Sequence, residues 1–300
     1  MDASKHKSVD RFSGINNVNQ PYRLFPEQTI DGYIFPLQEA NNVLIDNTFA
    51  IKSRCGYTSV VSGSGIHSLW SDGVRCFYVE GSTLYELDLA YNKKVISTVT
   101  PSLRMSYASV NNRYYYTNSR EIAYIEGAKS NGLMNIDREF KIPLPAGSHI
   151  EYFMGCLFVS KGNILYISDP LCDYFDARTG YRIFSDDITM IRAVDDGGLY
   201  VSDKKVWFIK GRGNDEFSRK EVDADPAIPF TDLRISADSM GYDSAGNVAI
   251  WTSKSGIVVG DSNGSVKNLT SDRYHVNEFG RGSAFIRDEN NIKHYINTLY

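Results

Sequence analysis

The sequence has few of the features that mark metal proteins, disulfide-bonded secreted proteins or membrane proteins. Its four cysteines, Cys55, Cys76, Cys156 and Cys172, have no C-x-x-C spacing, which predicts reduced structural thiols. Its five histidines form no H-x-x-x-H or H-E-x-x-H pattern, so no metal ligands are predicted. No run approaches ~18 apolar residues, and the first seven residues contain no apolar stretch. We therefore expect a protein without a membrane span or signal peptide, made in a reducing cytosol.

The motifs of common catalytic sites are also missing. The glycine-rich stretch 62–65 has no lysine after it, so its glycines are interpreted as turn residues and not as a phosphate-binding loop. Paired acids, such as Asp186 with Asp187 and Asp195 with Asp196, lie in expected turns, where solvated carboxylates are the usual interpretation. We therefore expect no enzyme and assign no catalytic, cofactor-binding or metal-binding residue.

No large excess of charge of one sign is present. The net charge is −4 and the isoelectric point is about 5.8. A general electrostatic attraction to DNA or to anionic membranes is therefore not expected.

A strand-turn-strand phrase rich in tyrosine, valine and isoleucine recurs about six times. The expected hairpins lie at 77–87, 115–125, 158–167, 200–209, 250–259 and 285–296. The first apolar residues of their second strands, from Leu84 to Ile292, are separated by 38, 42, 42, 51 and 35 residues. A hairpin cannot bury its apolar face alone, so a strand-only repeat of ~40 residues predicts blades packed around an axis. The expected fold is an all-β propeller of about six blades, with no helix.

The first part of the chain differs from these repeats. Residues 12–21 and 26–36 are rich in turn formers, which predicts an extended arm over 1–48 followed by a propeller domain over 49–300. The last repeat ends at Tyr300, without room for four strands. Because open sheet edges invite association, we expect a strand within Phe49–Val60 to complete the last blade.

Two histidines and two long loops in the repeats are given an expected role. The histidines His67 and His149 each open an expected inner strand, where a packed or hydrogen-bonded imidazole is the usual role. The long loops 168–176 and 211–217 are the first places to look for partner contacts, because loops on rigid scaffolds often carry function.

The most specific signal lies in three N-terminal phrases. They are FSGINNV at 12–18, LQEANNVLID at 37–46 and IKSRCGY at 51–57. These phrases resemble the opening of propeller-type tail proteins of tailed phages, a group that includes tail hub, nozzle and packaged-DNA stabilisation proteins. The resemblance covers about 50 residues closely and the remaining repeats by architecture alone.

The resemblance implies a structural component of the virion, made in the host cytoplasm and assembled as a homo-oligomeric ring around or below the DNA channel. Its implied partners are other copies of the chain and portal, adaptor or other tail proteins. Packaged DNA would pass nearby without sequence-specific binding, and no membrane is involved. The interface residues chosen from the family-like segments are Ile15, Asn16, Asn17, Arg54, Gly56 and Tyr57.

Two other functions remain open at this stage. One is a propeller that binds a glycan or a receptor, with loop aromatics such as Tyr174 and Phe175 as contact points. The other is a glycan-cleaving enzyme, which would need two carboxylates within ~10 Å in a central pocket.

Overall fold

The computed structural model describes residues 9, 11–46, 48–54, 56–195, 197–211, 217–240, 246–270, 273–276, 280–289 and 292–300. These residues form an all-β protein with almost no helix. Only two short 3₁₀ turns, η1 (Pro21–Arg23) and η2 (Asp238–Met240), interrupt the strands of the described part. The prediction of an all-β fold is confirmed.

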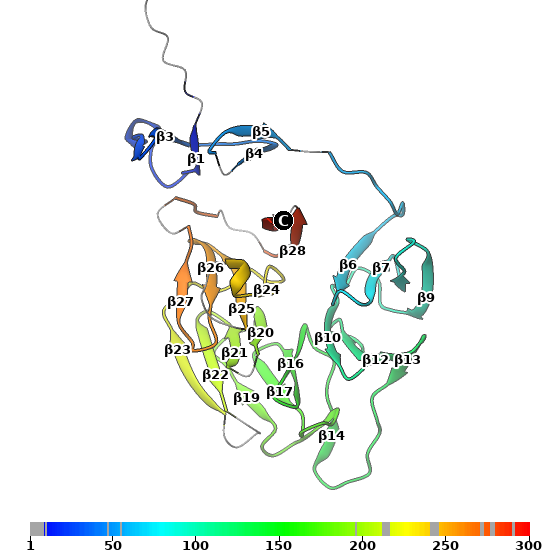
Figure 1. Cartoon of the computed structure of the whole chain (residues 1–300). Coiled ribbons are helices and arrows are strands. Elements are labelled where there is room, and N and C mark those ends of the chain that lie inside the picture. Colours follow the sequence, from blue (N-terminus) through cyan, green and yellow to red (C-terminus); the bar gives the residue numbers. More distant parts are fainter. Residues whose placement is uncertain are drawn as a thin grey trace, which may run out of the picture.

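Five four-stranded antiparallel sheets follow one another along the chain, each built from strands in sequence order. The first contains β6 (Ile66–Ser71), β7 (Cys76–Glu80), β8 (Thr83–Leu87) and β9 (Lys93–Thr98), and the second β10 (Ser106–Val110), β11 (Arg113–Thr117), β12 (Ile122–Glu126) and β13 (Lys129–Gly132). The third contains β15 (His149–Phe153), β16 (Cys156–Lys161), β17 (Ile164–Ile167) and β19 (Tyr181–Ile183). The fourth contains β20 (Met190–Val194), β21 (Gly198–Ser202), β22 (Val206–Lys210) and β23 (Ser218–Val222). The fifth contains β24 (Leu233–Ser236), β25 (Asn247–Ser253), β26 (Gly256–Gly260) and β27 (Val266–Asn268), and the sheets fan out in a propeller-like arrangement (Figure 1).

A sixth sheet has two strands, β28 (Gly282–Glu289) and β29 (Ile292–Leu299). In the first five sheets the repeated phrase falls on the second and third strands, but here it falls on the first and second. The start of β28 occupies the inner position, because the Gly282 amide donates to the Pro229 carbonyl at 2.9 Å and Arg104 donates to Ser283 at 2.7 Å. The sixth sheet therefore has no third or fourth strand among the described residues.

Apolar side chains between neighbouring sheets form the core. Five buried clusters lie in turn between the first and second, second and third, third and fourth, fourth and fifth, and fifth and sixth sheets. Fully buried members include Phe77, Phe158 and Trp251, and burial of such side chains stabilises the fold by about 1.5–3 kcal/mol each. Within the described residues no such cluster joins the sixth sheet to the first, and Leu69 and Phe285 remain exposed. Among these residues, apolar packing therefore joins each sheet to the next, from the first to the sixth.

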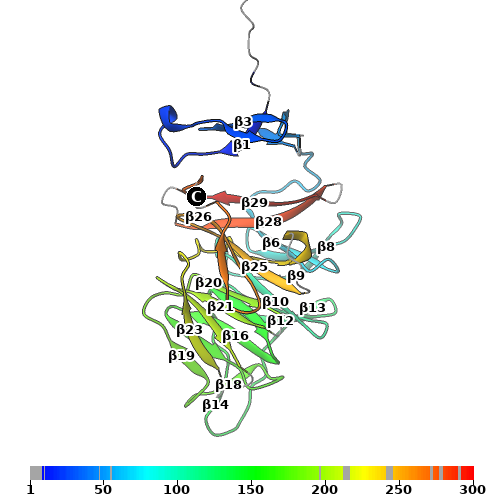
Figure 2. The same ribbon diagram turned by 60° about the vertical axis from the view of Figure 1, so that its left-hand side comes forward.

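The N-terminal arm forms two small sheets of its own. One has the order β1 (Phe12–Ile15), β3 (Gly32–Leu37), β2 (Glu27–Thr29), and the other pairs β4 (Val43–Ile45) with β5 (Ile51–Ser53). Figures 1 and 2 both show the arm lying beyond the β28–β29 hairpin. The β4–β5 hairpin spans the expected boundary between residues 48 and 49, and the first four-stranded sheet begins at Ile66.

The expected closing strand differs from the structure. Within Phe49–Val60 the described strand is β5, and it pairs with β4 instead of completing the sixth sheet. The physical reason is local, because the Asp46 carboxylate accepts hydrogen bonds from the Thr48 and Ala50 amides and pairs with Lys52 at 2.6 Å. These contacts close a tight hairpin, in which β5 pairs with β4 and not with β28–β29.

One further pair of strands bears on the site below. In the third sheet the chain leaves β17 through the 168–173 loop and forms β18 (Tyr174–Asp176), which pairs with β14 (Lys141–Pro143) before β19 returns to the sheet. The loop therefore passes over the outer surface between the second and third sheets.

Candidate functional site

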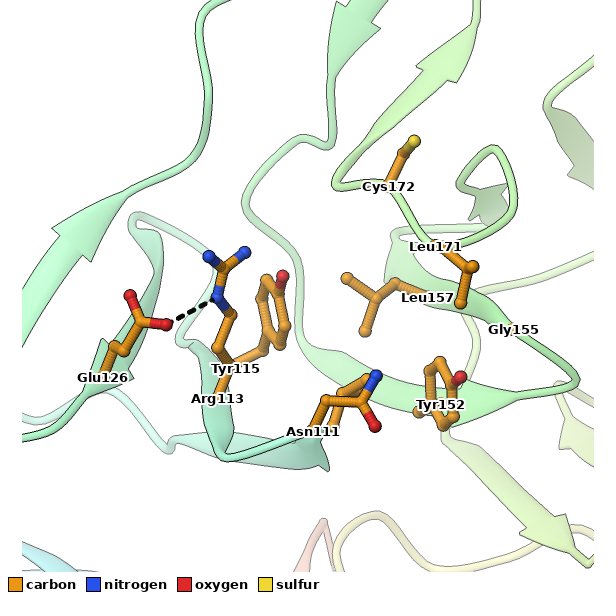
Figure 3. Close-up of a pocket in the computed structure, with 10 residues that line it drawn as sticks. Asn111, Arg113, Tyr115, Glu126, Tyr152, Gly155, Leu157, Leu171 and Cys172 are labelled. Atoms are coloured by element: carbon orange, nitrogen blue, oxygen red, sulfur yellow. Dashed lines mark hydrogen bonds and ion pairs between the residues drawn. The ribbon is translucent and has the colours of Figure 1, made fainter.

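A cavity of about 290 Å³ lies between the second and third sheets. Figure 3 shows side chains reaching it from both sheets, with Arg113, Tyr115 and Glu126 from one side and Tyr152, Leu157 and Leu171 from the other. The Arg113 guanidinium is 3.2 Å from the Glu126 carboxylate and lies over the Tyr124 ring, 4.7 Å from its centre. The cavity thus combines an ion pair, tyrosine hydroxyls and aliphatic groups.

Two tight hairpin turns position this cavity. Asn111 and Asn112 both have positive φ, at 47° and 63°, in the turn between β10 and β11. Met154 and Gly155 have φ of 49° and 84° in the turn between β15 and β16. Two successive left-handed residues make the hairpin turn whose twist matches that of the strands, and asparagine and glycine favour it. The two turns bring Asn111 and Gly155 to opposite sides of the cavity.

Leu171, from the 168–173 loop, completes the cavity wall. Its amide donates to the Gly155 carbonyl at 2.7 Å, which fixes the loop onto the β15–β16 turn. That the 168–176 loop makes partner contacts stays a prediction. The second loop expected to carry contacts, 211–217, lies mostly outside the described residues. Of the two aromatics considered for glycan contact, Phe175 is buried and Tyr174 is partly buried in β18.

A second group of polar residues lies on the inner strands. Arg192, in β20, donates to Glu151 of β15 at 2.9 Å and to Asp232, just before β24, at 2.7 and 2.9 Å. Both carboxylates are buried, at 7% and 5% exposure. Burial opposes the charge on Arg192, but the two carboxylates outweigh it and raise the pKa of the guanidinium. The three residues therefore form one ion cluster that joins the third, fourth and fifth sheets.

His149 lies next to this cluster. Its ring stacks on Phe230 with 4.7 Å between ring centres, and its Nδ1 contacts the hydroxyls of Ser148 and Ser160 at 3.1 and 3.2 Å. Burial lowers the pKa of His149 to about 4, so the imidazole is neutral at pH 7. The expectation of a packed, hydrogen-bonded histidine is confirmed.

Sequence reasoning missed the ion cluster, although a signal was present. Arg192 stands in the middle of an otherwise apolar strand and Glu151 in the middle of a buried one, and Glu151, Arg192 and Asp232 are separated by 41 and 40 residues, one repeat each. Charged residues one repeat apart in the first strand of each blade come together at the axis. Among the described residues no group of three or more His, Cys, Asp or Glu side chains suits a metal ion.

Of the three predicted interface residues of the first phrase, Ile15 and Asn16 pair within the arm, and Asn17 contacts a distant segment of the chain. Ile15 pairs with Leu37, and the Asn16 amide donates to the Leu37 carbonyl at 2.6 Å. Asn17 makes three hydrogen bonds to another part of the chain: its amide group donates to the His275 carbonyl at 2.9 Å and accepts from the His275 amide at 2.8 Å, and its backbone donates to Arg273 at 2.9 Å. Asn17 thus fixes the arm onto the segment before the sixth sheet.

Arg54, Gly56 and Tyr57 lie in the connection from β5 to β6. Arg54 donates to the Tyr57 hydroxyl at 2.9 Å, and Arg287 of β28 donates to the same oxygen at 3.2 Å. These hydrogen bonds, with that of Arg287 foremost, lower the pKa of Tyr57. Gly56 is exposed, and Cys55 lies outside the described residues. The structure therefore brings Arg54 and Tyr57 together with the sixth sheet and places Asn17 on a separate contact.

No protein-family model and no curated protein matches the chain. Similar solved structures include a virginiamycin B lyase from Staphylococcus aureus, at 12% identity and a TM-score of 0.49, covering 92% of this chain and 94% of that one. A gluconolactonase from Xanthomonas campestris has 12% identity and a TM-score of 0.48 over 79% and 84% of the two chains. The WD40 β-propeller domain of Doa1 has 10% identity and a TM-score of 0.42 over 67% of each chain. These similarities concern the fold alone.

One expectation needs correction. The sequence was interpreted as that of a protein without enzymatic activity, but the similar structures include a lactonase and a lyase. Catalytic propellers share this kind of fold, so the absence of familiar motifs does not exclude an enzyme. No helix in the described residues is long and apolar enough to cross a membrane.

Proposed function

We propose that the protein is a structural component of a phage tail, namely a hub, nozzle or head-tail stabilisation subunit. In this proposal it assembles with other copies of the chain into a ring. The N-terminal phrases resemble those of such proteins, and the observation that best supports the proposal is the exposed apolar surface of the arm. Only Ile34 is buried among the apolar residues of β1–β5, whereas Tyr22, Phe25 and Ile30 are largely exposed. Exposed apolar residues gathered on one segment are typical of protein interfaces.

The sixth sheet supports the same proposal. Its two strands make a sheet half as wide as the other five, and within the described residues the outer edge of β29 has no strand partner. An unpaired edge is a site where a strand of another chain can add. We infer a six-bladed propeller whose last blade is completed in the assembly by strands from a neighbouring subunit.

The proposed neighbours are further copies of the chain and portal, adaptor or other tail proteins in the virion. DNA would pass close to the ring without sequence-specific contacts. The negative net charge of −4 supports this, because an acidic surface repels the phosphate backbone.

The mass of the protein in solution tests the proposal, measured by light scattering alone and after mixing with portal and adaptor proteins of the same phage. We expect a defined oligomer or a stoichiometric complex. The double variant Phe25→Ser/Ile30→Ser is expected to abolish it, because both side chains are exposed and contribute little to the fold.

Leu89 provides the matched control. It is as exposed as Ile30 but lies in the turn between β8 and β9, away from the arm, so Leu89→Ser should leave the assembly intact. A wild-type protein that stays monomeric with every tail partner would refute the proposal.

A further inference from the structure

The cavity between the second and third sheets has a lining that suits a ligand rich in hydroxyl groups. Asn111 offers an amide that makes no side-chain hydrogen bond within the described residues, and Arg113 and Glu126 offer a planar donor and a planar acceptor side by side. The Tyr115 and Tyr152 rings add flat apolar surface with a polar tip. Adjacent hydroxyls on a ring both donate and accept, so they match such paired groups.

The charge and size of the cavity narrow the choice of ligand. Arg113 and Glu126 are the charged residues of the lining, and they neutralise each other. A volume of about 290 Å³ is just below the range of about 300–1,000 Å³ for small-molecule sites. A neutral ligand with one ring inside the cavity fits both properties.

Leu171 supplies an independent observation. Its φ is +59°, a left-handed conformation that is unfavourable for a bulky residue, and its side chain is 78% exposed. A Cβ built on Gly155 would lie 4.0 Å from Leu171 Cδ2, so the leucine side chain extends over the β15–β16 turn at the cavity. An exposed leucine in this conformation adds little to the core, and strained residues gather at ligand contacts.

We propose that this cavity binds a neutral saccharide, with one sugar ring between the Asn111 and Arg113–Glu126 groups and Leu171 covering its apolar face. The ring hydroxyls exchange hydrogen bonds with the amide and the ion pair, and the partly exposed Tyr152 packs against the carbon–hydrogen surface of the sugar, with the buried Tyr115 behind the cavity wall. The proposed saccharide site depends on this cavity alone, so its test is independent of the proposed role in a phage tail.

Saturation-transfer NMR on the full chain with glucose, galactose and N-acetylglucosamine tests the proposal. We expect at least one of the three sugars to give a saturable signal with a millimolar dissociation constant, because few groups contact one ring. No saturable signal from any of them at about 50 mM would overturn the proposal.

Leu171→Gly separates binding from folding. Glycine accepts the left-handed conformation without strain, so we expect little change in Tm, whereas loss of the covering side chain should raise Kd about tenfold. The matched control is Tyr91→Gly, because Tyr91 is also an exposed residue with positive φ, at 64°, but lies in the β8–β9 turn. Tyr91→Gly should leave Kd unchanged.

A second pair of variants tests the polar side of the cavity. Asn111→Gly removes the amide and keeps the turn, and we expect it also to weaken binding about tenfold. Asn112→Gly, in the same turn but outside the cavity lining, should bind as the wild type does. Sugar binding that is unchanged in both Leu171→Gly and Asn111→Gly would assign the signal to another surface and overturn the proposal.

Discussion

The ion cluster of Glu151, Arg192 and Asp232 offers a quantitative test of what holds successive sheets together near the axis. Arg192→Met keeps much of the side-chain bulk and removes three charge-assisted hydrogen bonds, at 2.7, 2.9 and 2.9 Å. Two buried carboxylates are then left without their cation. Breaking a buried ion pair by removing one partner typically costs about 3–5 kcal/mol, so we expect a loss of that size in the free energy of unfolding.

The expected loss of stability arises from the two uncompensated carboxylates, and further substitutions can remove their charges. In the triple variant Glu151→Gln/Arg192→Met/Asp232→Asn no ionised group remains in the cluster. We expect about 2 kcal/mol of the loss to be recovered, because amides are far less costly to bury than unpaired carboxylates.

The assay is urea unfolding at pH 7.5, followed by circular dichroism and by tryptophan fluorescence. Arg113→Met is the control, since Arg113 and Glu126 form a pair of similar chemistry with side chains 41% and 53% exposed. Exposed pairs contribute about 0–1 kcal/mol, so this variant should unfold almost as the wild type does. An Arg192→Met loss below about 1 kcal/mol, or a triple variant less stable than the single one, would refute the reasoning.

Two further predictions concern buried positions. Because the pKa of His149 falls from 6.5 to about 4 on folding, the unfolded state binds more protons between these values, and stability should decline as the pH falls through this window, by at most about 1.4 kcal/mol per pH unit. Stability measured from pH 7.5 to 4 should decline less steeply in His149→Phe than in the wild type, and equal slopes in the two proteins would contradict the assignment. Gly147→Ala should cost several kcal/mol, because a Cβ there would lie 2.1 Å from the Ser160 carbonyl oxygen, and thermal unfolding checks this against Gly132→Ala, where the Cβ meets nothing within 4 Å. A Gly147→Ala protein as stable as Gly132→Ala would show that the backbone yields at this point.

The sequence by itself determined the hairpins. Their turns and their alternating apolar residues are local signals, and the anchors Leu84, Ile122, Ile164, Val206 and Ile257 all lie in the third strand of a four-stranded sheet. The repeat length of ~40 residues predicts that similar sheets pack against one another, since no single hairpin can bury its apolar face. These features depend on residues near one another in the chain, so they could be predicted without the structure.

The tertiary structure alone decided how the N-terminal arm contacts the C-terminal part of the chain and which side chains lie together. The contact of Asn17 with His275 joins residues 258 positions apart, and the pairing of β5 with β4 was decided by the Asp46 turn against the expected closure of the last sheet. The cavity likewise depends on how two neighbouring sheets and the 168–173 loop face one another. Such contacts depend on the positions of whole sheets in space, and residues that are neighbours in the sequence carry no local signal for them.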